Sequence, residues 1–163
     1  MAPIRLDVRT LVLSLLVLVL AGACAQKGRP IGSPSGRRGA PGASAAALAR
    51  SLVGSPYRNG GADPDGFDCS GFVRYVFGEL GLAVPRSVGE QLATGERVNR
   101  NRLREGDVVF FAIDSRSVSH VGIVVSDDTF VHAPSSRGRV REESLNLAYW
   151  RSRFAGARRF VRR

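Results

Sequence analysis

A change in sequence periodicity near residue 106 constrains the fold of this chain more than any other feature. Before it, apolar residues recur at helical spacing. After it, the apolar segments are short and rich in β-branched and aromatic residues, and polar turns separate them. Helices followed by strands are typical of an α+β domain, in which N-terminal helices pack against an antiparallel sheet. The sequence predicts that fold class.

Three helices are expected in the first part of this domain. Ser44 is the expected N-cap of the first helix, and Gly54 is its expected stop. In the second, apolar residues between positions 72 and 80 keep the helical period until a glycine ends it. The third helix is predicted from Ser87 and Glu90, which have the spacing of a capping box.

Four later segments have the composition of strands, because they are short and dominated by β-branched and aromatic residues. They read "GDVVFFAI", "HVGIVV", "TFVHA" and "RRFVR". A helix is expected to intervene at "LNLAYWRSRF", residues 145–154.

The N-terminal part of the chain is expected to lie outside this fold. Arg5 and Arg9 precede an uncharged apolar run at residues 11–23. The run is too short to cross a bilayer as a helix, and a basic start followed by a short apolar stretch is typical of a secretory signal peptide. We therefore assign residues 1–23 to an export signal, which excludes them from the folded domain.

Cys24 follows this run, and two kinds of processing are open for it. The stretch "AGAC" resembles the lipobox of bacterial lipoproteins, whose cysteine is acylated, although Ala21 stands where leucine is usual. The triplets "AGA" and "ACA" would equally serve ordinary signal peptidase. Residues 24–43 are rich in Gly, Pro, Ser and Arg, so they predict a flexible tether that leads to a folded domain at residues 44–163.

The net charge of the chain is large, but it does not identify a single class of binding partner. With 24 basic and 14 acidic residues the chain carries a formal charge of +10, and such a surface favours polyanions. Nucleic acid, anionic lipid and acidic cell-wall polymers would all be attracted. No aromatic stacking platform accompanies the arginines near the C-terminus, so we expect no specific nucleic-acid binding.

Cys69 occupies an unusual place for a cysteine. It lies in "FDCSGFVRYVF", where Asp68 can cap the helix and put Cys69 in its first turn. Unpaired backbone N–H groups and the positive end of the helix dipole favour a thiolate there. The alternative is a buried structural thiol, which has no need of that position.

The chain has two histidines that could serve such a thiol. His120 opens one predicted strand and His132 lies in the next, so both fall downstream of Cys69 on neighbouring strands. A cysteine nucleophile needs a base and a group that orients the base, so the set predicts a Cys-His-X triad. Three such ligands plus water could also hold zinc, but most zinc sites have more protein ligands, and we expect neither metal nor cofactor.

The two histidines can meet only in one kind of hairpin. A four-residue loop would pair Val125 with Phe130 and put the rings on opposite faces of the sheet. We therefore predict a three- or five-residue turn, or a bulge, between the strands. A register with His132 opposite Gly122 would bring it diagonally against His120.

Taken together, "YRNGG", "FDCSGFVRYVF", "VPRSVGEQLATGERV", "LREGDVVFF", "HVGIVV" and "FVHAPSS" resemble the NlpC/P60 family of bacterial cell-wall cysteine peptidases over about residues 44–145. The resemblance implies a papain-like α+β fold. It also implies a substrate, the stem peptides of peptidoglycan, cut between γ-D-glutamate and diaminopimelate or lysine through a thioester intermediate.

The resemblance further implies roles for single residues. Cys69 would be the nucleophile, His120 the general base and His132 the orienting third residue. Asp68 and Ser70 would hold a free amine or polar group of the peptide, and the remaining site residue, Tyr57, would line the site.

The expected protein is a monomeric hydrolase without cofactors, exported and anchored at Cys24 to the outer membrane, facing the periplasm, with peptidoglycan as its partner. Two alternatives stay open. One is a non-catalytic envelope lipoprotein that binds peptidoglycan. The other is an amidase or transpeptidase that acts on another acyl substrate.

Overall fold

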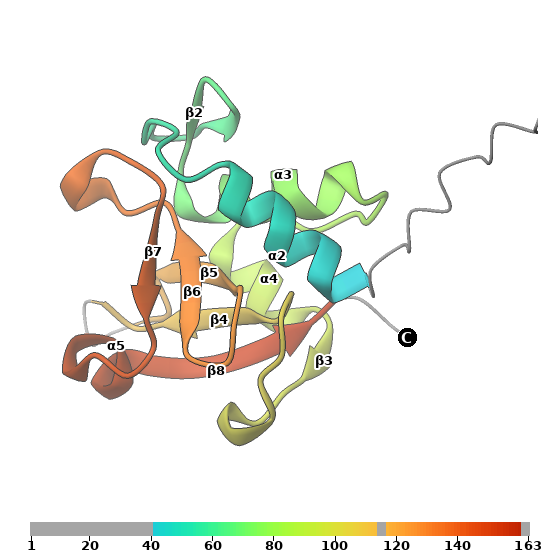
Figure 1. The fold of residues 1–163 in the computed structure, drawn as a ribbon, viewed down its shortest axis with the longest axis vertical. Coiled ribbons are helices and arrows are strands. Elements are labelled where there is room, and N and C mark those ends of the chain that lie inside the picture. Colours follow the sequence, from blue (N-terminus) through green and yellow to red (C-terminus); the bar gives the residue numbers. More distant parts are fainter. Residues whose placement is uncertain (1–40, 114–116, 161–163) are drawn as a thin grey trace, which may run out of the picture. The chain divides into compact units, whose positions relative to one another are not determined.

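The computed structural model describes residues 41–113 and 117–160, and its centre is a six-stranded sheet (Figure 1). The strand order is β3-β8-β4-β5-β6-β7, and every neighbouring pair is antiparallel. The strands are β3 (Glu96–Arg97), β4 (Val108–Phe111), β5 (His120–Val124), β6 (Thr129–His132), β7 (Arg141–Ser144) and β8 (Phe154–Arg159).

Helices accompany this sheet together with a small hairpin. They are α2 (Pro41–Ser51), α3 (Cys69–Glu79), α4 (Val88–Ala93) and α5 (Ala148–Arg153), with short 3-10 turns at Arg100–Arg102 and Ser135–Arg137. The hairpin consists of β1 (Ala62–Asp63) and β2 (Gly66–Phe67), directly before α3. The predicted α+β class, with helices on an antiparallel sheet, is confirmed.

The sheet separates two apolar clusters, because successive side chains of a strand point to opposite faces. On one face, Phe110 and Ile123 pack with the buried sides of α2 and α3. On the other, Phe111 and Phe130 pack with Trp150 of α5. Figure 1 shows α2 and α3 together on one side of the sheet. Strands β4 and β5 are buried along their whole length, which makes them a rigid support for the site.

The second and third predicted helices are confirmed. Helix α3 ends at Glu79 with Leu80 as its C-cap, where the apolar period stops. Helix α4 begins after a complete capping box, in which the Ser87 side chain accepts from the Glu90 N–H and the Glu90 side chain accepts from the Ser87 N–H.

The first helix begins earlier than predicted. It starts at Pro41 rather than after Ser44, so residues 41–43 are helical and not part of a tether. Proline is compatible with a first helical turn because no intrahelical partner awaits its nitrogen. Gly42 packs directly on the main chain of Glu105, so tertiary contact holds this extra turn, which composition alone does not reveal.

The later elements match in part. Strands β4, β5 and β6 lie in the predicted segments, and the intervening helix exists as the shorter α5. Strand β8 begins before "RRFVR", and the polar strands β3 and β7 were not predicted.

The expected signal peptide, most of the tether and Cys24 lie outside the described residues. Among the helices that the structure describes, none has the length and apolarity to cross a membrane.

Candidate active site

The start of α3 presents Cys69 as the sequence predicts. Cys69 is the first residue of the helix, and the carboxylate of its N-cap, Asp68, accepts a hydrogen bond from the Gly71 N–H at 2.7 Å. The loop that leads into β1 packs tightly here. A side chain at position 71 would collide with the carbonyl oxygen of Gly61, so the glycine after "DCS" allows the loop to hold the helix start in place.

The thiol of Cys69 points at the main chain that flanks His120. Its Sγ donates to the carbonyl oxygen of Ser119 over 4.0 Å. Burial, and then the negative charge of Asp68, raise the pKa of Cys69 to about 11, although the N–H groups at the helix start act in the opposite direction. The N–H groups at the helix start favour the thiolate as expected, but burial and the Asp68 carboxylate outweigh them, so the resting site favours the neutral thiol.

The hairpin of β5 and β6 has the register needed to bring the two histidines together. Val124 pairs with Phe130, and the Val125 N–H donates to the Thr129 carbonyl at 3.0 Å, which leaves a three-residue turn. The predicted odd-length turn is confirmed. His120 Nε2 and His132 Nδ1 lie 2.7 Å apart and share one hydrogen bond.

Burial keeps both rings uncharged. His120 is 8% exposed and His132 is fully buried. Burial, and then the adjacent His132, lower the pKa of His120 to about 3. Burial also lowers the pKa of His132, against the attraction of Glu143. At neutral pH each ring is therefore neutral and carries one proton, on one of its two nitrogens.

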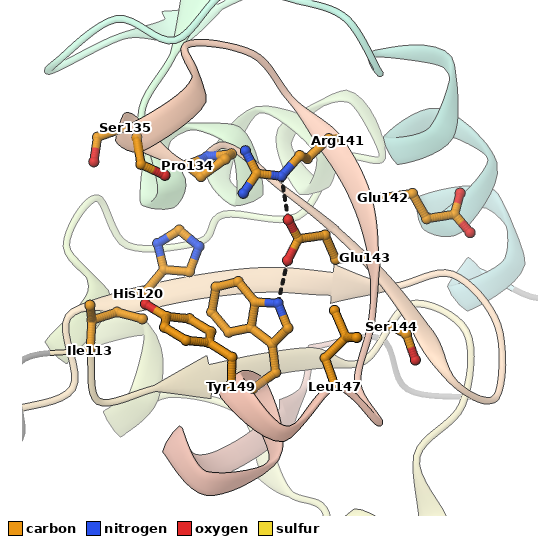
Figure 2. A pocket seen from close by; sticks show the side chains of 12 residues that line it. Ile113, His120, Pro134, Ser135, Arg141, Glu142, Glu143, Ser144, Leu147 and Tyr149 are labelled. Carbon is orange, nitrogen blue, oxygen red and sulfur yellow. Dashed lines mark hydrogen bonds and ion pairs between the residues drawn. The ribbon is translucent and has the colours of Figure 1, made fainter.

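A cluster that sequence reasoning missed surrounds the histidines from β7 and α5. Glu143 accepts from Arg141 Nε, as Figure 2 shows, and also from Trp150 Nε1. Trp150 also stacks on His120, with ring centroids 5.6 Å apart. His132 and, after it, the Arg141 and Trp150 donors hold the pKa of Glu143 at about 2 despite its partial burial. The polar segment "REES" gave no strand signal, so its side chains could not be assigned to a face.

A second polar cluster lies beside the thiol. Arg86 pairs with Asp68, with Nη2 to Oδ2 at 2.5 Å, and donates from Nη1 to Ser70 Oγ at 2.8 Å. Burial, and then the charges of Cys69 and Asp68, raise the pKa of Tyr57, which packs on the same side of the domain. Three residues that the sequence predicts for the site thus lie around Cys69: Tyr57, Asp68 and Ser70. Arg86 also belongs to this cluster, but the sequence gave no sign of it, because the residue lies in a loop.

Helix α4 is pinned to this cluster by a buried amide. Gln91 Nε2 donates to the carbonyl oxygens of Ser70 and Pro85 at 3.0 and 2.8 Å. The side chain is fully buried, so the link is shielded from water. It fixes the loop that carries Arg86 against the first turn of α3.

A cleft of about 840 Å³ opens beside His120. Its walls come from the segment after β6, from β7 and from Leu147, Tyr149 and Trp150, and Figure 2 shows His120 at one side of this space. A leaving group that takes a proton from His120 would have room there. Within residues 41–113 and 117–160, no group of three or more His, Cys, Asp or Glu side chains could hold a metal ion.

Comparison with known proteins finds a family match over most of the described residues. Residues 54–159 match the model of the NlpC/P60 family. The murein DD-endopeptidase MepS/murein LD-carboxypeptidase of Escherichia coli (strain K12) is 46% identical over 111 residues, which cover 68% of this chain and 58% of that protein. The gamma-DL-glutamyl hydrolase of Bacillus subtilis (strain 168) is 42% identical over 115 residues, which cover 69% of this chain and 28% of that protein.

Solved structures share the fold of this domain. An NlpC/P60 family protein from Bacillus cereus superposes with a TM-score of 0.71 at 32% identity, over 74% of this chain and 40% of that one. The NlpC/p60 domain of the peptidoglycan hydrolase SagA superposes with a TM-score of 0.63 at 30% identity, over 75% of this chain and 98% of that one. The matched residues span 58% and 28% of the lengths of the two curated relatives. With the family model matched along most of the described residues, the chain belongs to the NlpC/P60 family.

Proposed function

We propose that this protein is a cysteine peptidase that hydrolyses the stem peptides of peptidoglycan, at the bond between γ-D-glutamate and diaminopimelate or lysine. The observation that carries the proposal is the buried 2.7 Å contact between His120 and His132, next to the strand start against which the Cys69 thiol lies. The names of the relatives, a murein endopeptidase and a γ-glutamyl hydrolase, support the substrate class.

The first step transfers a proton from the thiol to His120. Because Cys69 is a neutral thiol and His120 a neutral imidazole at rest, the transfer accompanies the attack on the carbonyl carbon rather than preceding it. His120 accepts the proton at Nδ1, while its Nε2–H donates to His132 Nδ1 and keeps the ring in place.

The tetrahedral intermediate then meets the first turn of α3. N–H groups in a first helical turn have no intrahelical acceptor, so that of Cys69 can donate to the oxyanion. His120 returns its proton to the leaving amine, which departs into the cleft beside it. The acyl group stays on Sγ as a thioester until water, deprotonated by His120, hydrolyses it.

The polar cluster beside Cys69 gives the acyl side of the substrate its contacts. Asp68 and Ser70 hold a free amine or polar group of the peptide, and Tyr57 lines the site. The Asp68 side chain is 14% exposed and already paired with Arg86, so the cluster presents charges of both signs to the substrate. A peptide end with an ammonium and a carboxylate matches it.

The placement of the enzyme follows from the N-terminal sequence. We propose that the protein is exported, acylated at Cys24, and held as a monomer at the outer membrane, facing the periplasm. The excess of basic residues adds attraction to the acidic wall polymer.

Digestion of purified peptidoglycan tests the function. The wild-type protein is expected to release fragments that end at γ-D-glutamate, identified by mass spectrometry, and Cys69→Ala is expected to release none. Wall pellets from the same samples report binding. Binding without fragments from the wild type would reject the peptidase and support a non-catalytic binding protein. Fragments with exchanged rather than hydrolysed acyl groups would support a transpeptidase.

A further inference from the structure

Glu143 is held in one position by two donors that come from different elements. Arg141, on the same face of β7, donates to Oε1, and Trp150 of α5 donates to Oε2. The Glu143 side chain is 18% exposed, so water competes little for its oxygens. Figure 2 shows the Glu143 carboxylate next to the Arg141 guanidinium. The two hydrogen bonds therefore fix the position of the negatively charged carboxylate.

That carboxylate faces a buried nitrogen of the histidine pair. Glu143 Oε1 lies 3.8 Å from His132 Nε2, which is longer than a hydrogen bond and within reach of an electrostatic contact. Among the described residues, His132 Nε2 has no hydrogen-bond partner, although the His132 side chain is fully buried. Burying an unpaired ring N–H is costly, so an adjacent fixed carboxylate offsets part of that cost.

The histidine pair has two possible proton arrangements, because the 2.7 Å contact between the rings holds one proton. In the first, His132 carries its proton on Nε2, so its Nδ1 accepts from His120 Nε2–H and His120 Nδ1 keeps a lone pair. In the second, His132 Nδ1–H donates to His120 Nε2, and the proton of His120 sits on Nδ1. Only the first arrangement leaves His120 a lone pair for the thiol.

We propose that Glu143 is a positioning residue that selects the first of these arrangements. A carboxylate attracts an N–H at His132 Nε2 and repels a lone pair there, so it places the proton on that nitrogen and, through His132, determines which nitrogen of His120 is basic. The proposal rests on the proposed role of His120 as general base. The relay then runs from Glu143 through His132 and His120 to Cys69.

Trp150, a residue of α5, helps to hold Glu143 in the position from which it selects the proton arrangement. The indole donates to Glu143 and stacks on His120, so one side chain contacts both the carboxylate and the base. This arrangement explains why a tryptophan with a buried N–H is found beside the histidines, where an apolar ring would otherwise fill the space.

The test compares Glu143→Gln with Glu142→Gln in the full chain. Glutamine keeps the size of the side chain and one acceptor oxygen but removes the charge. Glu142 is a matched control for the tautomer, because it is the preceding residue of β7, is 38% exposed, and contacts Thr129 and Arg50 rather than a histidine. Thermal unfolding by circular dichroism confirms that both variants are folded.

The first readout is the tautomer of each ring, from long-range proton–nitrogen NMR spectra of protein with labelled histidine, and the chain's two histidines make the spectrum simple. Wild type and Glu142→Gln are expected to carry both protons on Nε2. Glu143→Gln is expected to place a proton on Nδ1 of both rings in a substantial fraction of molecules. An unchanged tautomer in Glu143→Gln would overturn the proposal.

The second readout is the kinetics on a soluble stem peptide. Loss of the correct tautomer in other triads costs up to about 10⁴-fold in kcat, and for this more distant residue we expect a fall in kcat of at least about tenfold with KM within about twofold. A fall in kcat without a tautomer change would mean that Glu143 acts by another route and would also overturn the proposal. If the wild type cleaves no peptide, the NMR result still decides whether Glu143 sets the tautomer, so the two failures are separable.

Discussion

At the scale of single residues, the Cys69 thiol and the His120 imidazole are both uncharged in the resting site. The pKa of Cys69 is raised to about 11 and that of His120 is lowered to about 3, so neither is ionised near neutral pH. Burial dominates both shifts. The thiol therefore becomes reactive only when a substrate approaches it. At that point His120, the base, is already in contact with His132, which orients it.

Alkylation of Cys69 should report this protonation state. We expect slow reaction with iodoacetamide at pH 7 and a rate that rises toward pH 11, because only the thiolate reacts. Asp68→Asn should shift the rise to lower pH, since the carboxylate raises the thiol pKa and asparagine still caps a helix. Glu79→Gln, at the far end of α3, serves as the control. Fast, pH-independent alkylation of the wild type would indicate a preformed ion pair instead.

At the scale of secondary-structure elements, one hairpin decides whether the histidines meet. Gly122 makes this possible, because a Cβ there would lie 2.6 Å from the Phe130 ring and 2.8 Å from the Val131 carbonyl oxygen. A side chain at this position would push β6 away from β5. His132 would then move away from His120.

Gly122→Ala should therefore cost both stability and activity. We expect a loss of about 1–3 kcal/mol in the free energy of unfolding from overpacking, and a kcat that falls more than stability alone would explain. Gly78→Ala is the control, because nothing lies within 4 Å of a Cβ added there. It should stabilise α3 by about 0.5–1 kcal/mol. Denaturant titration and peptide hydrolysis measure both effects, and wild-type activity in folded Gly122→Ala would contradict the role given to the register.

Prediction from sequence succeeded where local chemistry decides the structure. The capping box of Ser87, the capping of α3 by Asp68 and the parity of the hairpin turn all depend on nearby residues, and all three are confirmed. It failed where tertiary contacts decide. The polar strand β7 gives no periodic signal, so Glu143 and its link to the histidines became visible only in the fold.

At the scale of the whole molecule, neutral buried histidines make stability depend on pH. The pKa of His120 is about 3 in the folded protein against an ordinary value of 6.5, so below pH 6.5 the unfolded chain binds a proton that the folded protein does not. The contribution of neutral His120 to stability is full above pH 6.5 and is lost progressively as the pH falls toward 3. Glu143, with a pKa of about 2 against an ordinary 4.5, adds a further loss below pH 4.5.

Thermal unfolding between pH 8 and pH 4 tests this linkage. We expect the wild-type Tm to be level above pH 6.5 and to fall below it. His120→Gln should fall less steeply between pH 6.5 and 4.5, because it lacks one of the groups that titrate there. Parallel Tm curves for the two proteins would show that His120 is not held neutral by the fold.

Anchoring at Cys24 is tested in cells. Acylation predicts that the wild-type protein fractionates with membranes and that its N-terminal peptide carries fatty acyl chains by mass spectrometry. Cys24→Ala should be processed differently and released from the membrane fraction. A wild-type protein cleaved beyond Cys24, without acyl groups, would favour simple secretion.

The most direct test of the central claim is to trap the thioester at Cys69. Hydroxylamine competes with water for a thioester, so digestion of peptidoglycan in its presence should convert part of the released fragments from γ-D-glutamyl acids to γ-D-glutamyl hydroxamates, detected by mass spectrometry. Cys69→Ala should give neither product. Hydrolysis by the wild type without any hydroxamate, or fragments from Cys69→Ala, would contradict a mechanism in which the Cys69 sulfur carries the acyl group.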